Sequence, residues 1–178
     1  MKPRIFAAAV LLLLTACGSG SSSSTTTPTS PTNTTTATTG WKVTQRFVSV
    51  DGPDNCWVSE QRARLGPAVF PDLPMTVVRS GSSITLESGF FQVNYAGTAS
   101  GNDFTASGVK PLDGGGTPCK DGTSFQQLPG VSNLTGSFSS DNQQLTATEV
   151  NSYRLTSGEP VTYTWAWQAT RQVSAAAR

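Results

Sequence analysis

The sequence contains no histidine in its 178 residues. Because histidine is the commonest general base and metal ligand near neutral pH, catalytic sites of the Ser-His-Asp or Cys-His type are excluded. Charged residues are also scarce, at 13% of the chain with a net charge of +1, and no basic stripe is present that could follow a phosphate backbone. We therefore predict a protein that is not an enzyme, uses no cofactor and does not bind nucleic acid.

The acidic residues do not indicate a site either. Paired-carboxylate catalysis needs two acids that converge on a cleft, whereas the aspartates stand in turn-like sequence. These are Asp51, Asp54, Asp72, Asp103, Asp113, Asp121 and Asp141. In such turns the carboxylate usually accepts hydrogen bonds from nearby backbone groups. We accordingly predict no catalytic residues and no metal site.

The chain has a single long apolar run, Ile5 to Leu14, which follows a basic start, Met1-Lys2-Pro3-Arg4. The run is too short to cross a bilayer but has the length of the apolar region of a secretory signal. It ends in Leu14-Thr15-Ala16-Cys17, which resembles the lipobox of bacterial lipoproteins.

The lipobox resemblance implies that residues 1–16 are removed as a signal peptide and that Cys17 becomes an acylated N-terminus. Two or more acyl chains then anchor a protein stably to a membrane. Gly18 follows the cysteine, and in the enterobacterial sorting pattern that this ending resembles, a residue other than Asp implies the outer membrane of a Gram-negative bacterium. The alternative is an ordinary signal peptide that ends in a chance cysteine.

The number of cysteines supports this interpretation, because an exported protein usually has an even number and this sequence has three. Acylation of Cys17 leaves Cys56 and Cys119, which we predict to form a disulfide in an oxidising compartment. Their bond would close a loop of about sixty residues and stabilise the fold by ~4 kcal/mol in the chain-entropy model. Two free buried thiols are the alternative.

Composition divides the rest of the chain into three parts. Residues 17–40 are nearly all Ser and Thr after the cysteine and carry no charge. Such a segment cannot bury apolar surface, so we expect a disordered tether. A β-domain then spans residues 41–173, and residues 174–178 form a C-terminal tail.

From Trp41 onward, apolar and polar residues alternate with a period of two, and no segment predicts an amphipathic helix. Residues 57–65 are predicted as the second strand on this pattern, with Trp57, Ala63 and Leu65 on one face. Similar turn-rich hairpins occupy residues 95–107 and 134–148. Eight or nine short strands result, and we predict an all-β antiparallel meander closed into an up-and-down barrel, with a β-sandwich as the alternative.

An early Gly40-Trp41 pair and Arg171 at the end of the last predicted strand resemble features of the lipocalin-type barrel. In that family the tryptophan and arginine stack on each other, although one residue separates the glycine from the tryptophan. The Gly-Thr-x-Ser hairpins are similar to those of lipocalin-like bacterial lipoproteins with no assigned activity. The resemblance implies a barrel topology and carries no functional motif.

Candidate ligand-binding residues lie on the last two predicted strands. Tyr163, Trp165 and Trp167 share one face and form either the barrel core or the wall of a ligand site. The alternation around Leu145 to Tyr153 also places Glu149 and Asn151 inward. A buried carboxylate needs hydrogen-bond donors, for which Gln45 and the indole N–H of Trp165 or Trp167 are available. A local bulge that turns Glu149 to solvent is the alternative.

Two functions remain compatible with these features. The first is a membrane-anchored, non-catalytic envelope domain that binds a small apolar or amphipathic ligand inside the barrel. The second is a packed structural or protein-interaction module of the cell envelope, with no small-molecule ligand.

The lipid anchor leads to a direct prediction. Replacement of Cys17 by Ser removes the thiol that is acylated, so we expect the variant to leave the membrane fraction and to lack acyl mass. Fractionation and intact-mass measurement check this, and a variant that stays on the membrane would contradict the anchor.

Overall fold

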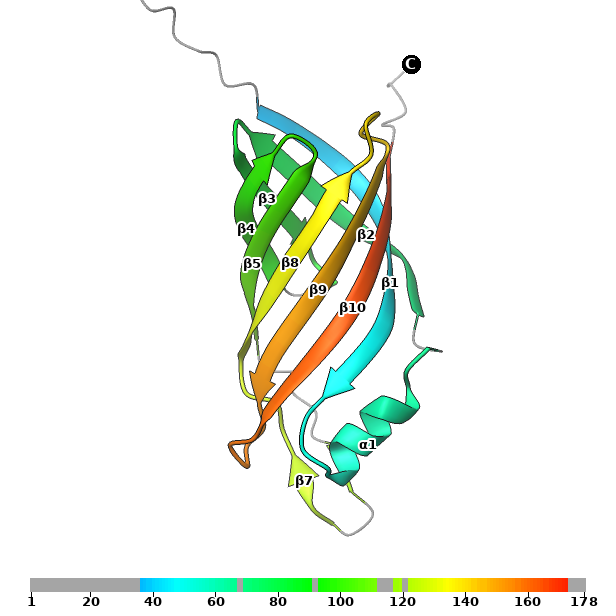
Figure 1. Ribbon diagram of the computed structural model, residues 1–178, viewed down its shortest axis with the longest axis vertical. Helices are drawn as coiled ribbons and strands as arrows, with labels where there is room; N and C mark the ends of the chain where they lie inside the picture. Colours follow the sequence, from blue (N-terminus) through cyan, green and yellow to red (C-terminus); the bar gives the residue numbers. More distant parts are fainter. Residues whose placement is uncertain (1–35, 67–68, 91–92, 112–116, 120–121, 173–178) are drawn as a thin grey trace, which may run out of the picture. The chain divides into compact units, whose positions relative to one another are not determined.

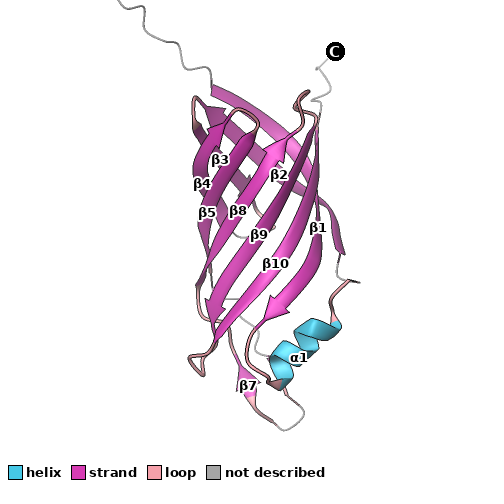
Figure 2. Cartoon of the chain, in the orientation of Figure 1, coloured by secondary structure: helices cyan, strands magenta, loops and turns pink. Residues whose placement is uncertain are grey.

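A computed structural model of the protein describes residues 36–66, 69–90, 93–111, 117–119 and 122–172. Residues 1–35, which include the predicted signal peptide, Cys17 and most of the predicted tether, and the tail at 174–178 lie outside the described residues. Figure 1 shows a β-barrel with one short helix, and Figure 2 shows how little helix there is. The barrel strands are β1 (Thr36–Asp51), β2 (Val69–Ser80), β3 (Ser83–Ser88), β4 (Val93–Ser100), β5 (Asp103–Lys110), β8 (Gly130–Phe138), β9 (Gln144–Arg154) and β10 (Pro160–Arg171).

The eight strands follow one another around the barrel in chain order, and all neighbours are antiparallel. Strand β1 pairs with β2 on one side and with β10 on the other, which closes the sheet and leaves no open edge strand in the ring. The long connection from β5 to β8 holds a separate two-stranded sheet of β6 (Thr117–Pro118) and β7 (Ser124–Phe125). The predicted up-and-down barrel is therefore confirmed, and the β-sandwich alternative is wrong.

The period-two pattern produces the interior of the barrel, because alternate side chains of a strand point to opposite faces. In β9 the buried residues are Leu145, Ala147, Glu149, Asn151 and Tyr153. Strands β4 and β5 pack closely because they carry small residues at inward positions. A Cβ at Gly97 would overlap the backbone carbonyl of Thr105, so only glycine permits this approach.

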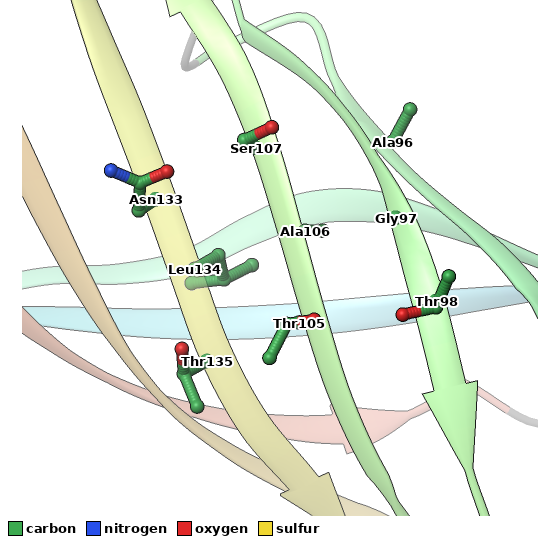
Figure 3. A pocket seen from close by; sticks show the side chains of 9 residues that line it. All are labelled: Ala96, Gly97, Thr98, Thr105, Ala106, Ser107, Asn133, Leu134 and Thr135. Carbon is green, nitrogen blue, oxygen red and sulfur yellow. The ribbon is translucent and has the colours of Figure 1, made fainter.

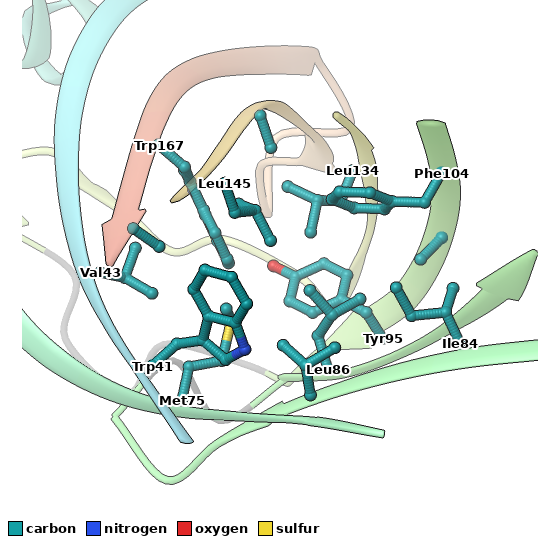
Figure 4. Packing of buried hydrophobic residues seen from close by; sticks show 14 of the residues in the cluster. Trp41, Val43, Met75, Ile84, Leu86, Tyr95, Phe104, Leu134, Leu145 and Trp167 are labelled. Atoms are coloured by element: carbon teal, nitrogen blue, oxygen red, sulfur yellow. The ribbon is translucent and has the colours of Figure 1, made fainter. Parts of the chain in front are cut away.

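Buried apolar side chains form two clusters along the barrel. The first cluster fills the part nearer to the start of β1 and includes Trp41, Tyr95 and Trp167 (Figure 4). The second cluster fills the opposite end and joins Phe47 and Tyr163 to the helix. Inside each cluster the aromatic rings are in contact, which makes both of them well-packed cores.

The predicted second strand at residues 57–65 is wrong, because the segment forms helix α1 (Cys56–Ala63). Asn55 caps the helix by accepting a hydrogen bond from the backbone N–H of Val58 at 2.9 Å. Trp57 and Val58 are both buried, and neighbouring residues cannot both point inward from a strand with one buried face. An N-cap asparagine ahead of good helix formers was the available signal for this helix.

One boundary at the start of the barrel also differs from the sequence-based expectation. Strand β1 begins at Thr36, so residues 36–40 pair with β2 and are not part of a disordered tether. Trp41 and Arg171 are direct cross-strand partners in the β1–β10 ladder, which brings together the two residues that suggested a lipocalin-type barrel. The indole N–H of Trp41 donates to the hydroxyl of Thr39 at 2.8 Å.

The predicted disulfide is present between Cys56 and Cys119, with a Cα–Cα distance of 5.9 Å and a sequence separation of 63 residues. It joins the first residue of α1 to the long β5–β8 connection, at the barrel end opposite to the start of β1 (Figure 1). None of the described helices is long and apolar enough to cross a membrane.

Removal of the disulfide is expected to destabilise the domain by up to ~4 kcal/mol, because the unfolded chain regains the entropy of an open loop. The Cys56→Ser/Cys119→Ser variant should therefore unfold at a lower urea concentration than the wild type. Wild-type protein treated with an alkylating reagent before reduction is the control. Two alkylated cysteines in that control would contradict the bond.

Candidate functional site

A layer of polar side chains crosses the barrel between the two apolar clusters. The alternation in β1 places Gln45 inward between Val43 of the first cluster and Phe47 of the second. The same alternation in β9 places Glu149 and Asn151 inward. We call this set the polar layer, and its members are Gln45, Tyr95, Ser132, Glu149, Asn151 and Trp167.

Glu149 is the centre of the polar layer, with a side chain that is only 2% exposed. Its Oε2 atom accepts hydrogen bonds from Gln45 Nε2 at 2.6 Å and from Trp167 Nε1 at 2.9 Å. Its Oε1 atom accepts from the hydroxyl of Tyr95 at 2.6 Å and from Ser132 Oγ at 2.7 Å. An ionised carboxylate is an acceptor on both oxygens, so this set of donors matches its charged form.

Ser132 links Glu149 to the second inward polar residue of β9, because its hydroxyl also contacts Asn151 Oδ1. The hydroxyl has one hydrogen to donate. When Ser132 donates that hydrogen to Glu149, the Asn151 side chain is oriented so that its NH₂ group donates a hydrogen bond to the Ser132 hydroxyl. Every group in the polar layer then has a hydrogen-bond partner, as buried polar groups require.

Neutral groups rather than a cation compensate the charge of Glu149. Among the described residues, the ion pairs are Lys42 with Asp72 and Arg62 with Asp54, and both lie at the surface. Burial, followed by the charge of Glu149 and the hydrogen bond to it, raises the pKa of Tyr95 far above its ordinary value of 10.0. Tyr95 therefore stays protonated and remains a donor to the carboxylate.

The polar layer and the rings beside it extend across the lumen. Tyr95 on β4 reaches across the barrel to Glu149 on β9, and its ring centroid lies 5.8 Å from that of Trp167 (Figure 4). Farther along the barrel, Trp41 of β1 meets Phe138 of β8 at 5.6 Å. The centre of the barrel is thus packed with side chains from opposite walls.

The structure divides the predicted ligand-binding residues into two groups. Glu149, Asn151 and Trp167 are at most 2% exposed, and Tyr163 is also buried, in the second cluster. The inward position of Glu149 is confirmed, and the alternative of a bulge toward solvent is wrong. Trp165 differs, because it is half-buried and stacks on Phe47 at 4.7 Å, whereas Trp167 supplies the indole donor to Glu149.

Trp165 belongs to a chain of rings that leads from the core to the surface. Phe70 at the start of β2 lies 5.8 Å from Trp165, and Phe90 lies 6.1 Å from Phe70. Phe70 is 38% exposed and Phe90 54% exposed. We call Phe47, Trp165, Phe70 and Phe90 the aromatic chain. Sequence reasoning missed Phe70 and Phe90, because the contacts of Phe70 with Trp165 and of Phe90 with Phe70 depend on the strand register.

Sequence reasoning also missed Tyr95 and Ser132 as partners of Glu149. The alternation of Val93 and Tyr95 indicated an inward tyrosine, but nothing local indicated which side chain it would meet. Within the described ranges, no group of three or more His, Cys, Asp or Glu side chains is arranged to hold a metal ion. The polar layer holds one carboxylate, that of Glu149, and four donors fix its position.

No protein-family model and no curated protein matches the sequence. Among solved structures, the chain is similar to a mutant of the vaccine antigen Transferrin Binding Protein B from Haemophilus parasuis Hp5, with a TM-score of 0.44 and 12% identity. The similarity covers 79% of this chain but only 27% of that protein. A likeness at this level says nothing of the function of this chain.

Replacement of Glu149 by Gln is expected to reduce the free energy of unfolding by about 1–3 kcal/mol, because charge-assisted hydrogen bonds are lost and an NH₂ group faces donors. The tryptophan emission should change as well, since the Trp167 indole loses its anionic acceptor. Urea unfolding followed by fluorescence measures both effects.

Glu87→Gln serves as the matched control, because Glu87 lies exposed on β3 and its replacement should stay within about 0.5 kcal/mol of the wild type. Equal stability and emission for Glu149→Gln and the control would contradict the structural role of the polar layer.

Proposed function

We propose that this protein is a lipid-anchored envelope lipoprotein whose barrel is a packed, non-catalytic interaction module that binds through its outer surface. The observation that carries this proposal is the hydrogen-bonded polar layer across the lumen. Glu149 takes hydrogen bonds from four strands other than its own, and a ligand that entered there would have to replace all of them. A buried donor or acceptor without a hydrogen-bond partner is costly, so these contacts disfavour the entry of a ligand into the lumen.

The anchor in this proposal rests on the residues before the barrel. The Leu14-Thr15-Ala16-Cys17 ending supports acylation of Cys17, with residues 1–16 as the signal peptide. The Ser/Thr-rich residues 18–35 would serve as the tether, and Gly18 supports delivery to the outer membrane. The Cys56–Cys119 disulfide accords with an exported domain, because disulfides persist in oxidising compartments.

A second function is favoured by the aromatic chain. Two exposed phenylalanines, Phe70 and Phe90, lie against each other, and Phe70 also contacts Trp165, so together they offer a ring-lined apolar surface. A small apolar or amphipathic molecule could bind there without disturbing the polar layer. In this second function, the small-molecule site would lie at the aromatic chain rather than among Tyr163, Trp167, Glu149 and Asn151.

Native mass spectrometry of the purified chain distinguishes these functions. For a packed module, we expect the mass of the lipidated protein alone, with no further adduct. An adduct that disappears in a Phe70→Ala/Phe90→Ala variant would support the second function instead. An adduct that survives in this variant but disappears in Glu149→Gln would overturn both and show a ligand in the lumen.

A further inference from the structure

Charge is distributed unevenly around the outside of the barrel. On β4, β5, β8, β9 and β10, every charged residue except the buried Glu149 stands at the end of a strand. These end residues are Asp103, Lys110, Arg154 and Arg171. In contrast, β1, β2 and β3 carry charge within their lengths, at Lys42, Arg46, Asp72, Arg79 and Glu87. One side of the barrel is therefore an uncharged wall, unlike the charge-rich surfaces that usually keep proteins soluble.

Small hydroxyl and amide side chains cover the middle of this wall, and four of the threonines form a row across the strands. Thr98, Thr105, Thr135 and Thr148 are direct cross-strand partners on four successive strands. Beside this threonine row, a shallow groove of about 310 Å³ crosses β4, β5 and β8, with Ser107 and Asn133 on its other wall (Figure 3). The groove is a stripe of small residues and does not by itself identify a ligand.

A larger groove of about 570 Å³ crosses β9, β10 and β1 at the edge of the wall. The strand register places three cross-strand partner residues along each of the two sides of this groove. One side is Thr44, Gln168 and Thr146, and the other is Lys42, Thr170 and Gln144. Its volume lies within the ~300–1,000 Å³ range that is usual for ligand sites.

The side-chain amides of this groove are available for a ligand. Gln144 and Gln168 are exposed, and neither side-chain amide makes a hydrogen bond within the part of the chain that the structure describes. Each amide presents a donor and an acceptor side by side, and the threonine hydroxyls act as both. The one cation in the groove, Lys42, lies 4.0 Å from the carboxylate of Asp72, so the groove carries little net charge.

This chemistry matches a neutral polyhydroxyl molecule better than a protein. A glycan carries neighbouring hydroxyl groups that pair with the donor and acceptor of an amide. Protein-interface hot spots depend on tryptophan, tyrosine and arginine, and none of the groove's lining residues is of these types. Anionic ligands gain little there, because Asp72 lines the same groove and offsets the charge of Lys42.

We propose that the groove across β9, β10 and β1 binds a neutral oligosaccharide chain, with the Gln144 and Gln168 amides as its main hydrogen-bonding groups. The inference rests on the proposed surface-binding module and names a ligand class for it. Binding through exposed hydrogen bonds alone is weak for a single site. Many anchored copies facing one polymer would raise the avidity.

The test titrates the mature chain, solubilised with its anchor, with a tetramer of N-acetylglucosamine and with maltotetraose, and follows binding by calorimetry and by NMR shifts. Saturable binding of at least one of these neutral probes is expected. The Gln144→Ala/Gln168→Ala variant should weaken it at least tenfold at an unchanged unfolding temperature. Asn133→Ala, which removes an exposed amide from the smaller groove, should leave the affinity within twofold of the wild type.

Absence of binding for both probes, or equal affinity of the wild type and the double glutamine variant, would overturn the glycan assignment. A photo-crosslinker placed at Gln168 separates this failure from failure of the proposed function. If it captures a defined protein in cells and no glycan binds, the ligand class is wrong while the surface-binding module stands. If native mass spectrometry shows a lumenal adduct, the module itself is wrong.

Discussion

A carboxylate inside a β-barrel can be kept only if several strands meet it with donors at the same time. Glu149 is held in this way by Gln45 from β1, Tyr95 from β4, Ser132 from β8 and Trp167 from β10. Each of these bonds is charge-assisted, which strengthens it, and each connects β9 to another part of the wall. The same carboxylate that would be costly if left alone therefore fixes the relative positions of five strands.

The rest of the interior follows from this layer. Apolar side chains fill the space on each side of it, so the core is split into two clusters rather than forming one continuous body. The second cluster extends onto α1, and the disulfide at Cys56 fastens that helix to the β5–β8 connection. Because the polar layer crosses the lumen, the proposed function uses the outer surface. There the two notable features are the aromatic chain that ends at Phe90 and the uncharged wall with its grooves.

The polar layer and the uncharged wall both consist of hydrogen-bonding side chains. No second acid accompanies Glu149 in the polar layer, and its four donors hold it as an acceptor. On the outer wall, the amides of Gln144 and Gln168 offer hydrogen bonds without acid–base chemistry. The inner surface of the sheet uses these groups to hold the fold, and the proposed glycan site would use those of the outer surface.

Local chemistry was enough to predict the barrel, the disulfide and the inward direction of Glu149. Strand alternation has a strict period of two, and cysteine parity needs no geometry, so both can be read along the chain. Helix α1 was missed because Trp57, Ala63 and Leu65 stand at alternate positions, as on one face of a strand, whereas the burial of both Trp57 and Val58 became visible only in the packed structure. The partners of Glu149 and the meeting of Phe70 with Trp165 were decided by tertiary structure alone. Those contacts depend on the register and closure of strands far apart in sequence, and no local pattern specifies which residue lies across a barrel.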